Sequence, residues 1–196
     1  MGQSGLQTAE DGLGEPEKSV YREWAHAPSH LFKPNAAYIV TAGTHHKARL
    51  FDTAQKRDFL LASLFDEAER WKWELQAWAV MANHYHFVAL APDDANTLKQ
   101  MIASLHSKTA IELNKRDATP GRKVWFQYRD TCLTNEKSYF ARLHYVHYNP
   151  VKHGLAREAA SYRWCSMAWF TKEARSGFRR TVLSFRHDQI QIEDDY

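Results

Sequence analysis

The order of β-rich and helical segments between residues 37 and 129 is the feature that most restricts the fold of this chain. Strands are marked by runs of apolar, β-branched and aromatic residues, and helices by apolar residues at helical spacing. The predicted segments are, in chain order, a strand over 37–43, a helix starting at Asp52-Thr53, strands over 75–82 and 84–90, a helix capped by Asn96 or Thr97, and a strand over 124–129. A βαββαβ order predicts an α+β fold in which an antiparallel sheet carries helices on one face.

A third helix is predicted after the last strand. It opens at Thr134 or Asn135, and Tyr139, Leu143 and Val146 form its inward stripe. We expect Pro150 to end it, because the residue before a proline disfavours the helical conformation.

Two histidines stand in the centre of the predicted strand 84–90. His84 and His86 are separated by one residue, and side chains of a strand alternate between its faces, so both imidazoles are expected on the same face. Two neutral imidazoles on a rigid strand can supply two ligands of a divalent metal. A pair of hydrogen-bonded sheet histidines is the alternative interpretation of this pattern.

The third helix carries a second group of polar side chains. Tyr145 and Asn149 are four residues apart, with Arg142 one turn earlier, so a phenol and an amide lie side by side on the helix. The phenol can act as a nucleophile on a phosphodiester and form a phosphotyrosyl intermediate, and the amide oxygen can be a third ligand of a hard divalent metal. Because the ordinary pKa of a phenol is about 10, the metal or Arg142 must stabilise the phenolate. The alternative is a half-buried aromatic followed by an Asn at the helix end.

Bulk composition is compatible with this chemistry and excludes some classes of protein. The 196 residues suffice for one domain with tails, and a net charge of +3 permits nucleic-acid binding without requiring it. Cys132 and Cys165 lack metal-ligand spacing and are predicted to be buried free thiols of a reducing compartment. No secretory leader and no apolar run approaching 18 residues is visible, so we expect a cytoplasmic protein with no membrane partner.

Three motifs resemble a known family. Met81-Ala82-Asn83-His84-Tyr85-His86-Phe87-Val88 resembles the HUH motif (His, hydrophobic, His) of single-tyrosine transposases. Tyr145-Val146-His147-Tyr148-Asn149-Pro150-Val151-Lys152-His153-Gly154-Leu155 resembles the tyrosine segment of the REP-associated tyrosine transposases. Tyr162-Arg163-Trp164-Cys165-Ser166-Met167 is similar to their aromatic-Trp-Ser-Ser-Tyr element, but Cys165 and Met167 depart from it, so we expect only a packing role there. Tyr85 is bulkier than usual between the histidines and is expected to pack on the opposite face.

This resemblance implies a ferredoxin/RRM-like fold with a C-terminal catalytic helix. It also implies a nucleoid-associated enzyme that nicks and rejoins single-stranded hairpin DNA, such as REP-like palindromes, with Mg²⁺ or Mn²⁺. The reaction would pass through a 5′-phosphotyrosine and release a free 3′-OH. Carried onto this chain, Tyr145 is the nucleophile, His84 and His86 are metal ligands, and Asn149 is the third ligand. Residues 1–35 are then an N-terminal extension, partly loose, 36–170 the transposase-like catalytic domain, and 171–196 a C-terminal tail; a monomer and a homodimer both stay open.

Basic side chains near these motifs are predicted DNA contacts, since they can follow a phosphate backbone. They are His45, His46, Lys47, Arg49, Lys123, Arg142, Lys152 and His153. A solvated charged surface is the alternative for each of them. For the whole chain, the alternative hypothesis is an RRM-like nucleic-acid-binding module with a vestigial catalytic site. A metal hydrolase that uses water is disfavoured because no Asp or Glu accompanies the histidine pair.

Overall fold

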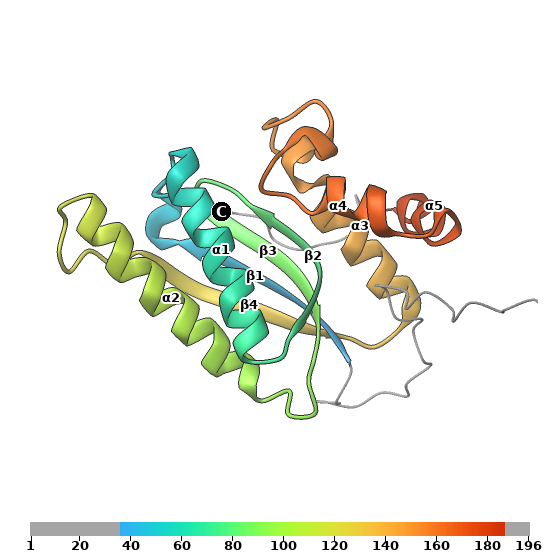
Figure 1. Cartoon of the computed structure of the whole chain (residues 1–196), viewed down its shortest axis with the longest axis horizontal. Coiled ribbons are helices and arrows are strands. Elements are labelled where there is room, and N and C mark those ends of the chain that lie inside the picture. Colours follow the sequence, from blue (N-terminus) through green and yellow to red (C-terminus); the bar gives the residue numbers. More distant parts are fainter. Residues whose placement is uncertain (1–35, 187–196) are drawn as a thin grey trace, which may run out of the picture.

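The computed structural model describes residues 36–186 (Figure 1). The predicted N-terminal extension, residues 1–35, lies outside this range. The described part contains a four-stranded sheet with the strand order β2-β3-β1-β4, in which all neighbours pair antiparallel. The strands are β1 (Ala37–Thr44), β2 (Glu74–Val80), β3 (His84–Leu90) and β4 (Trp125–Leu133). The predicted α+β fold is confirmed; β4 runs four residues beyond its predicted end because it pairs with β1 as far as Ala37.

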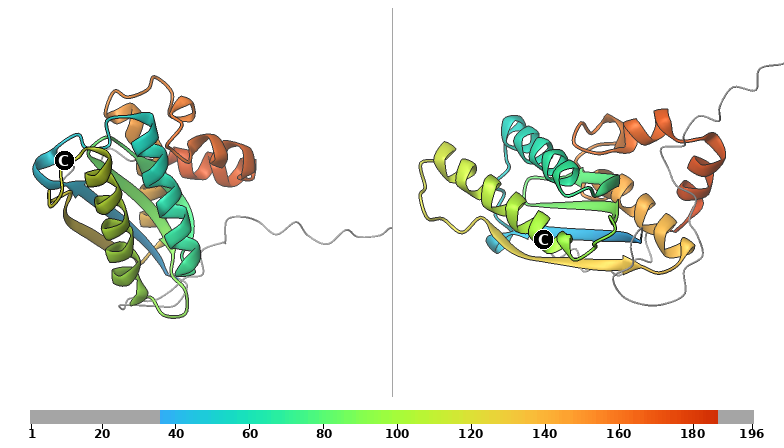
Figure 2. Two further views of the ribbon diagram at one scale, coloured as in Figure 1. Left: turned by 60° about the vertical axis from the view of Figure 1, so that its left-hand side comes forward. Right: turned by 60° about the horizontal axis from the view of Figure 1, so that its bottom comes forward.

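Helices cover both faces of this sheet. The helices α1 (Ala54–Arg70) and α2 (Thr97–Arg116) lie on one face, over a core that includes Tyr38, Leu64 and Phe87 (Figures 1 and 2). On the other face lies α3 (Glu136–Lys152), over a second core that includes Ile39, Val88 and Leu143; α4 (Met167–Glu173) and α5 (Ser176–Ser184) pack against α3. The described part of the predicted C-terminal tail is therefore helical, and Val182 of α5 is buried in this second core.

Pro150 does not end α3, so that prediction is wrong. The helix continues to Lys152, and its end is set by Gly154, whose φ of +66° is the left-handed conformation that suits glycine. The Leu155 N–H donates to the Pro150 carbonyl at 2.8 Å, and the Gly154 N–H donates to the Val151 carbonyl at 2.9 Å. This is a Schellman motif, which satisfies the last carbonyls of a helix. A proline so near the end removes a single hydrogen bond, which the helix tolerates.

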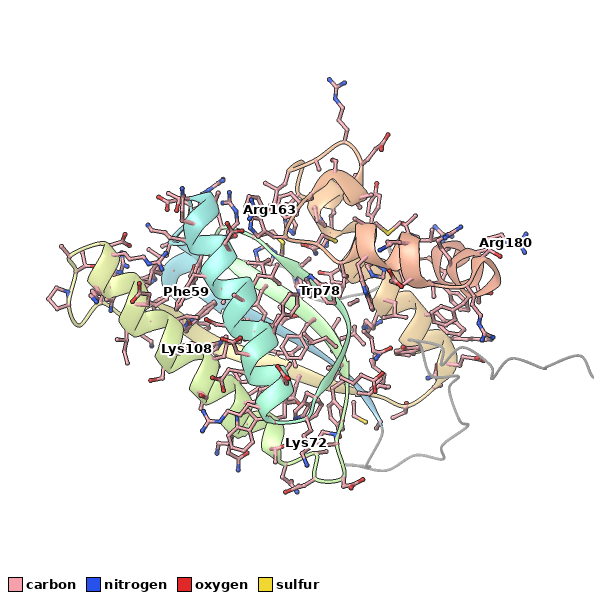
Figure 3. The ribbon with its side chains drawn as sticks, in the orientation of Figure 1. Phe59, Lys72, Trp78, Lys108, Arg163 and Arg180 are labelled. Carbon is pink, nitrogen blue, oxygen red and sulfur yellow. The ribbon has the colours of Figure 1, made fainter. Side chains whose placement is uncertain are left out.

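The segment 162–166 covers the outer edge of β2. The Val80 N–H donates to the Trp164 carbonyl at 3.0 Å, the Ser166 N–H donates to the Trp78 carbonyl at 2.9 Å, and Ala79 forms a bridge with Cys165. Trp78 itself packs between the α1 and α4 layers at this edge (Figure 3), with its ring 5.2 Å from that of Trp169. The predicted packing role of this segment is confirmed, since it pairs an otherwise open edge strand. Both cysteines are free, with Cys165 buried and Cys132 partly so.

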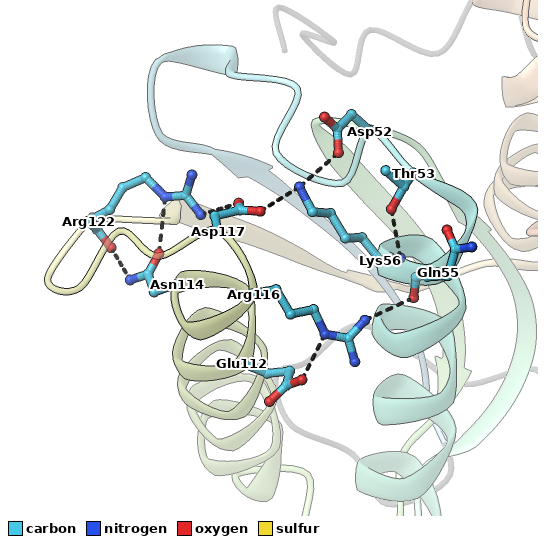
Figure 4. A network of polar contacts seen from close by, with 9 residues as sticks. All are labelled: Asp52, Thr53, Gln55, Lys56, Glu112, Asn114, Arg116, Asp117 and Arg122. Carbon is cyan, nitrogen blue, oxygen red and sulfur yellow. Dashed lines mark hydrogen bonds and ion pairs between the residues drawn. The ribbon is translucent and has the colours of Figure 1, made fainter.

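Ion pairs join the start of α1 to the end of α2 (Figure 4). The Lys56 Nζ lies 2.9 Å from a carboxylate oxygen of both Asp52 and Asp117, and Arg122 contacts Asp117 at 2.7 Å. The hydrogen bond from Lys56 lowers the pKa of Asp117. The network fixes the connection from α2 into β4, so Arg122 is used within the fold whereas its neighbour Lys123 is exposed.

Candidate active site

The β3 strand presents His84 and His86 to α3, and Tyr85 to the opposite face. The two imidazole centroids are 5.1 Å apart, and the side chains are only 2% and 0% exposed. Tyr85 is fully buried in the core beneath α1 and α2, and its hydroxyl lies 2.9 Å from the His106 Nε2. The expectation that Tyr85 packs away from the histidines is confirmed.

Each histidine ring is oriented by a polar neighbour. The His84 Nδ1 lies 2.9 Å from the Asn83 Oδ1, and the His86 Nδ1 lies 2.7 Å from the Thr41 Oγ1. Because an amide oxygen only accepts hydrogen bonds, Nδ1 of His84 carries the proton, which puts the lone pair of the neutral ring on Nε2. Such orienting contacts are typical of metal-binding histidines. Sequence reasoning missed Thr41 and Asn83; a threonine facing His86 across the strand pair was the available signal.

The C-terminal half of α3 brings three more predicted residues to this pair. The ring of Tyr145 lies 5.3 Å from that of His86, and the ring of His153 lies 4.8 Å from that of His84. Residues 145, 149 and 153 are spaced one turn apart, so Asn149 lies between these two contacts on the same stripe. Tyr145 and Asn149 are 1% and 0% exposed. The structure therefore places the predicted nucleophile beside the predicted ligands.

The donor set could bind a divalent cation. Both amide atoms of Asn149 are buried, and neither has a hydrogen-bond partner among the described residues. Such a group costs free energy unless something binds it. No group of three or more His, Cys, Asp or Glu that could bind a metal occurs within residues 36–186. The Asn149 Oδ1 is a candidate third ligand beside the two imidazoles. Two imidazole nitrogens and one amide oxygen would bind Mg²⁺ or Mn²⁺ more weakly than carboxylates do. They would leave coordination positions for water and for a phosphate oxygen.

The local electrostatics favour a neutral His86 and an anionic ligand. Burial, together with the neighbouring His84, His153 and Lys152, holds the pKa of His86 well below its ordinary value. A neutral ring is the form that binds metal. The exposed Lys152 places its Nζ 5.1 Å from the centre of the Tyr145 ring, and is thus a cation close to the phenol.

The predicted DNA contacts that follow β1 lie at the end of the sheet where Asn83 precedes His84. His45, His46 and Lys47 form the short 3-10 helix η1 (His45–Lys47), in which His46 and Lys47 both have a φ of 56°. The Asn83 Nδ2 donates to the Lys47 carbonyl at 3.4 Å, and the His45 N–H donates to the Val124 carbonyl at 2.8 Å. The exposed members of the predicted set here are His46, Lys47, Arg49 and Lys123.

Arg142 is not brought to the histidine pair. It lies one turn before Tyr145, half-buried, in the wall of an open pocket of about 580 Å³ between α3 and the end of α5. Lys137 and Arg186 also line this pocket, with Ser138, Ser184 and Phe185. Burial lowers the pKa of Arg142, and the interaction with Tyr145 acts in the opposite direction. Arg142 thus lines a second basic region and also interacts electrostatically with the Tyr145 phenol, and Lys152 is a further cation near that phenol.

Comparisons with known proteins bear on the family and the fold of this chain. The family model for IS200-like transposases matches residues 33–148, which include His84, His86 and Tyr145. No curated protein matches. Among solved structures, the chain is similar to a REP-associated tyrosine transposase bound to a REP hairpin, with a TM-score of 0.60 and 15% identity, over 74% of this chain and 85% of that chain. A putative transposase from Deinococcus radiodurans R1 gives a TM-score of 0.44 and 16% identity, over 63% of this chain and 95% of that chain. No helix within residues 36–186 is long and apolar enough to cross a membrane.

Proposed function

Because this chain belongs to the family of IS200-like transposases, we propose that it is a metal-dependent endonuclease and strand transferase for single-stranded DNA. Its substrate would be a hairpin of the REP type, the DNA to which the structurally similar REP-associated transposase is bound. The observation that carries the proposal is the contact of Tyr145 with His86, at 5.3 Å between ring centroids. The Asn149 amide, which has no hydrogen-bond partner within residues 36–186, lies on the same stripe of α3.

Tyr145 is the nucleophile of the proposed reaction. Its phenolic oxygen forms a bond to phosphorus, the bond from phosphorus to O3′ breaks, and the phenolic proton leaves through solvent and ends on the departing 3′ oxygen. The products are a 5′-phosphotyrosine and a free 3′-OH, and the reverse reaction rejoins the strands.

The other site residues position the phosphate and balance its charge. His84, His86 and Asn149 would bind Mg²⁺ or Mn²⁺, which supplies charge neutralisation at the phosphate. Lys152 stabilises the phenolate form of Tyr145 through its Nζ, 5.1 Å from the ring centre. Because Tyr145 is almost fully buried, the DNA phosphate reaches it only after a local rearrangement around the C-terminal half of α3.

The test uses a labelled single-stranded hairpin incubated with the protein and Mg²⁺ or Mn²⁺, and analysed on a denaturing gel. We expect a covalent protein–DNA adduct that requires metal and disappears in Tyr145→Phe. The matched control is Tyr148→Phe, which removes the hydroxyl of an exposed tyrosine on the same helix and should leave the adduct unchanged.

Two outcomes would replace the proposal by one of its alternatives. Cleavage without an adduct, retained in Tyr145→Phe, would identify water as the nucleophile. Tight hairpin binding with neither cleavage nor adduct, for both metals and several hairpins, would identify a binding module with a vestigial site.

A further inference from the structure

A β-bulge turns Phe126 toward the face of the sheet that carries His84. Ala42 pairs with Tyr128, but Thr44 pairs with Trp125, so β4 has one extra residue over this interval. Trp125 and Tyr128 both pack in the core beneath α1 and α2. Phe126 and Gln127 therefore both stand opposite Gly43 and share the other face, and Gly43 pairs with His84 on its other side.

The ring of Phe126 is exposed and lies beside one cation, Lys123, and the His45 ring. It is 53% exposed, which is unusual for a phenylalanine in a strand. The Lys123 Nζ lies 5.9 Å from the centre of this ring, and the His45 ring lies 6.4 Å from it. The ring of His46 is in turn 3.9 Å from that of His45. An exposed aromatic ring with neighbouring basic groups is the arrangement that binds unpaired bases, with stacking on the ring and the phosphate on the cations.

The neighbouring backbone holds this platform at a fixed place relative to the site. Hydrogen bonds join His45 to Val124 and Thr44 to Asn83, each at 2.8 Å from N to O. Phe126 and His84 belong to strands separated only by β1, so their backbones lie about 10 Å apart at the usual strand spacing. A single strand whose phosphate lies at His84 can thus place a nearby base on Phe126.

We propose that Phe126, with Lys123 and His45, forms a stacking subsite for an unpaired base of the DNA strand next to the hairpin. This inference rests on the proposed function in taking DNA as the substrate. It adds a preference that none of the catalytic residues supplies: a hairpin with an unpaired extension should bind more tightly than a hairpin that ends in a base pair. It also identifies Phe126 as a substrate-binding residue, which charge and motif alone do not indicate.

The experiment measures binding by fluorescence anisotropy in EDTA, so that no cleavage occurs. Three labelled hairpins are compared, one blunt and the others with four unpaired nucleotides at the 5′ or the 3′ end. Wild type should favour one extended hairpin over the blunt one, and Phe126→Ala should weaken binding of that hairpin by about 5- to 100-fold. Phe126→Trp should retain the preference. Ile111→Ala, which removes a more exposed apolar side chain from α2, is the matched control and should bind as wild type does.

A base analogue reports on stacking directly. With 2-aminopurine at successive positions of the unpaired extension, one position should lose fluorescence on binding to wild type and recover it in Phe126→Ala. The inference is overturned if Phe126→Ala binds the extended hairpin as wild type does, or if it weakens the blunt hairpin equally. A retained Phe126 effect with no covalent adduct in the metal-containing assay would overturn the proposed function and leave this subsite standing.

Discussion

Asn149 has a buried side-chain amide without a hydrogen-bond partner in the described part of the chain. Such a group lowers the stability of the folded protein. We predict that Asn149→Leu, similar in branching but apolar, raises the free energy of unfolding of the metal-free protein by about 1–3 kcal/mol, because a buried unsatisfied group is removed. The same change should lower the affinity for Mn²⁺ at least tenfold, since an oxygen ligand is lost. Urea unfolding in EDTA and calorimetric titration with Mn²⁺ measure the two effects.

A second asparagine provides the control. Asn114 is half-buried, and its amide is paired: the Nδ2 donates to the Arg122 carbonyl at 2.8 Å and the Oδ1 accepts from the Arg122 Nε at 3.0 Å. Asn114→Leu should therefore destabilise the protein and leave Mn²⁺ binding unchanged. If Asn149→Leu instead destabilised the fold while Mn²⁺ binding persisted, Asn149 would be a structural residue and not a ligand.

Among the elements, the end of α3 determines where Lys152 and His153 lie. Gly154 has a φ of +66°, and a Cβ added there would meet nothing within 4 Å. We predict that Gly154→Ala costs about 1 kcal/mol through backbone strain alone, and that it weakens hairpin binding because the last turn of α3 frays. The control is Gly177→Ala in α5, where the space is equally open and φ is not left-handed; it should be neutral or slightly stabilising. Equal destabilisation by the two changes would contradict the role given to Gly154.

The pattern of apolar residues was enough to predict β1 to β4 and α1 to α3, but not α4 and α5. β3 was predicted with its observed bounds, and His84 and His86 share a face because alternation in a strand admits no other result. The C-terminal end of α3 was mispredicted because the helix was expected to stop at Pro150. The Schellman hydrogen bonds around Gly154, four residues later, set its end instead. Residue propensities for the helix do not take into account a capping glycine four residues after the proline.

Contacts between elements were less accessible to sequence reasoning. The HUH and tyrosine motifs indicated that Tyr145 belongs with the histidines, although they are about sixty residues apart. Nothing in the sequence indicated the bulge that exposes Phe126, since a bulge depends on the register between β1 and β4. Arg142 was grouped with Tyr145 from helix spacing, and the two side chains do interact electrostatically. The pocket that Arg142 also lines, between α3 and the end of α5, was not predicted.

At the scale of the whole molecule, neutral histidines are buried on both sides of the sheet. His86 and His147 lie on the α3 side, and His106 lies on the other side, where its ring stacks on Trp125 at 4.4 Å. Burial lowers the pKa of His106 to about 3 and that of His147 to about 3, and the pKa of His86 is also lowered. The fold therefore keeps these rings uncharged under conditions in which the unfolded chain protonates them.

This arrangement predicts that acid destabilises the metal-free protein. Between pH 6.5, the ordinary pKa of histidine, and about pH 3, the unfolded state binds a proton at His106 that the native state does not bind, so the free energy of unfolding rises with pH in this window. Each such histidine contributes up to about 1.4 kcal/mol per pH unit. Urea unfolding in EDTA at pH 7.5, 6.0 and 5.0 should show the decline. In His106→Phe, which keeps a ring against Trp125, the slope of the free energy of unfolding against pH should decrease by about the contribution of one proton. The lost contact to the Tyr85 hydroxyl shifts the free energy of unfolding equally at every pH. An unchanged slope in His106→Phe would show that His106 is already protonated in the native protein and that its burial is not the source of the acid sensitivity.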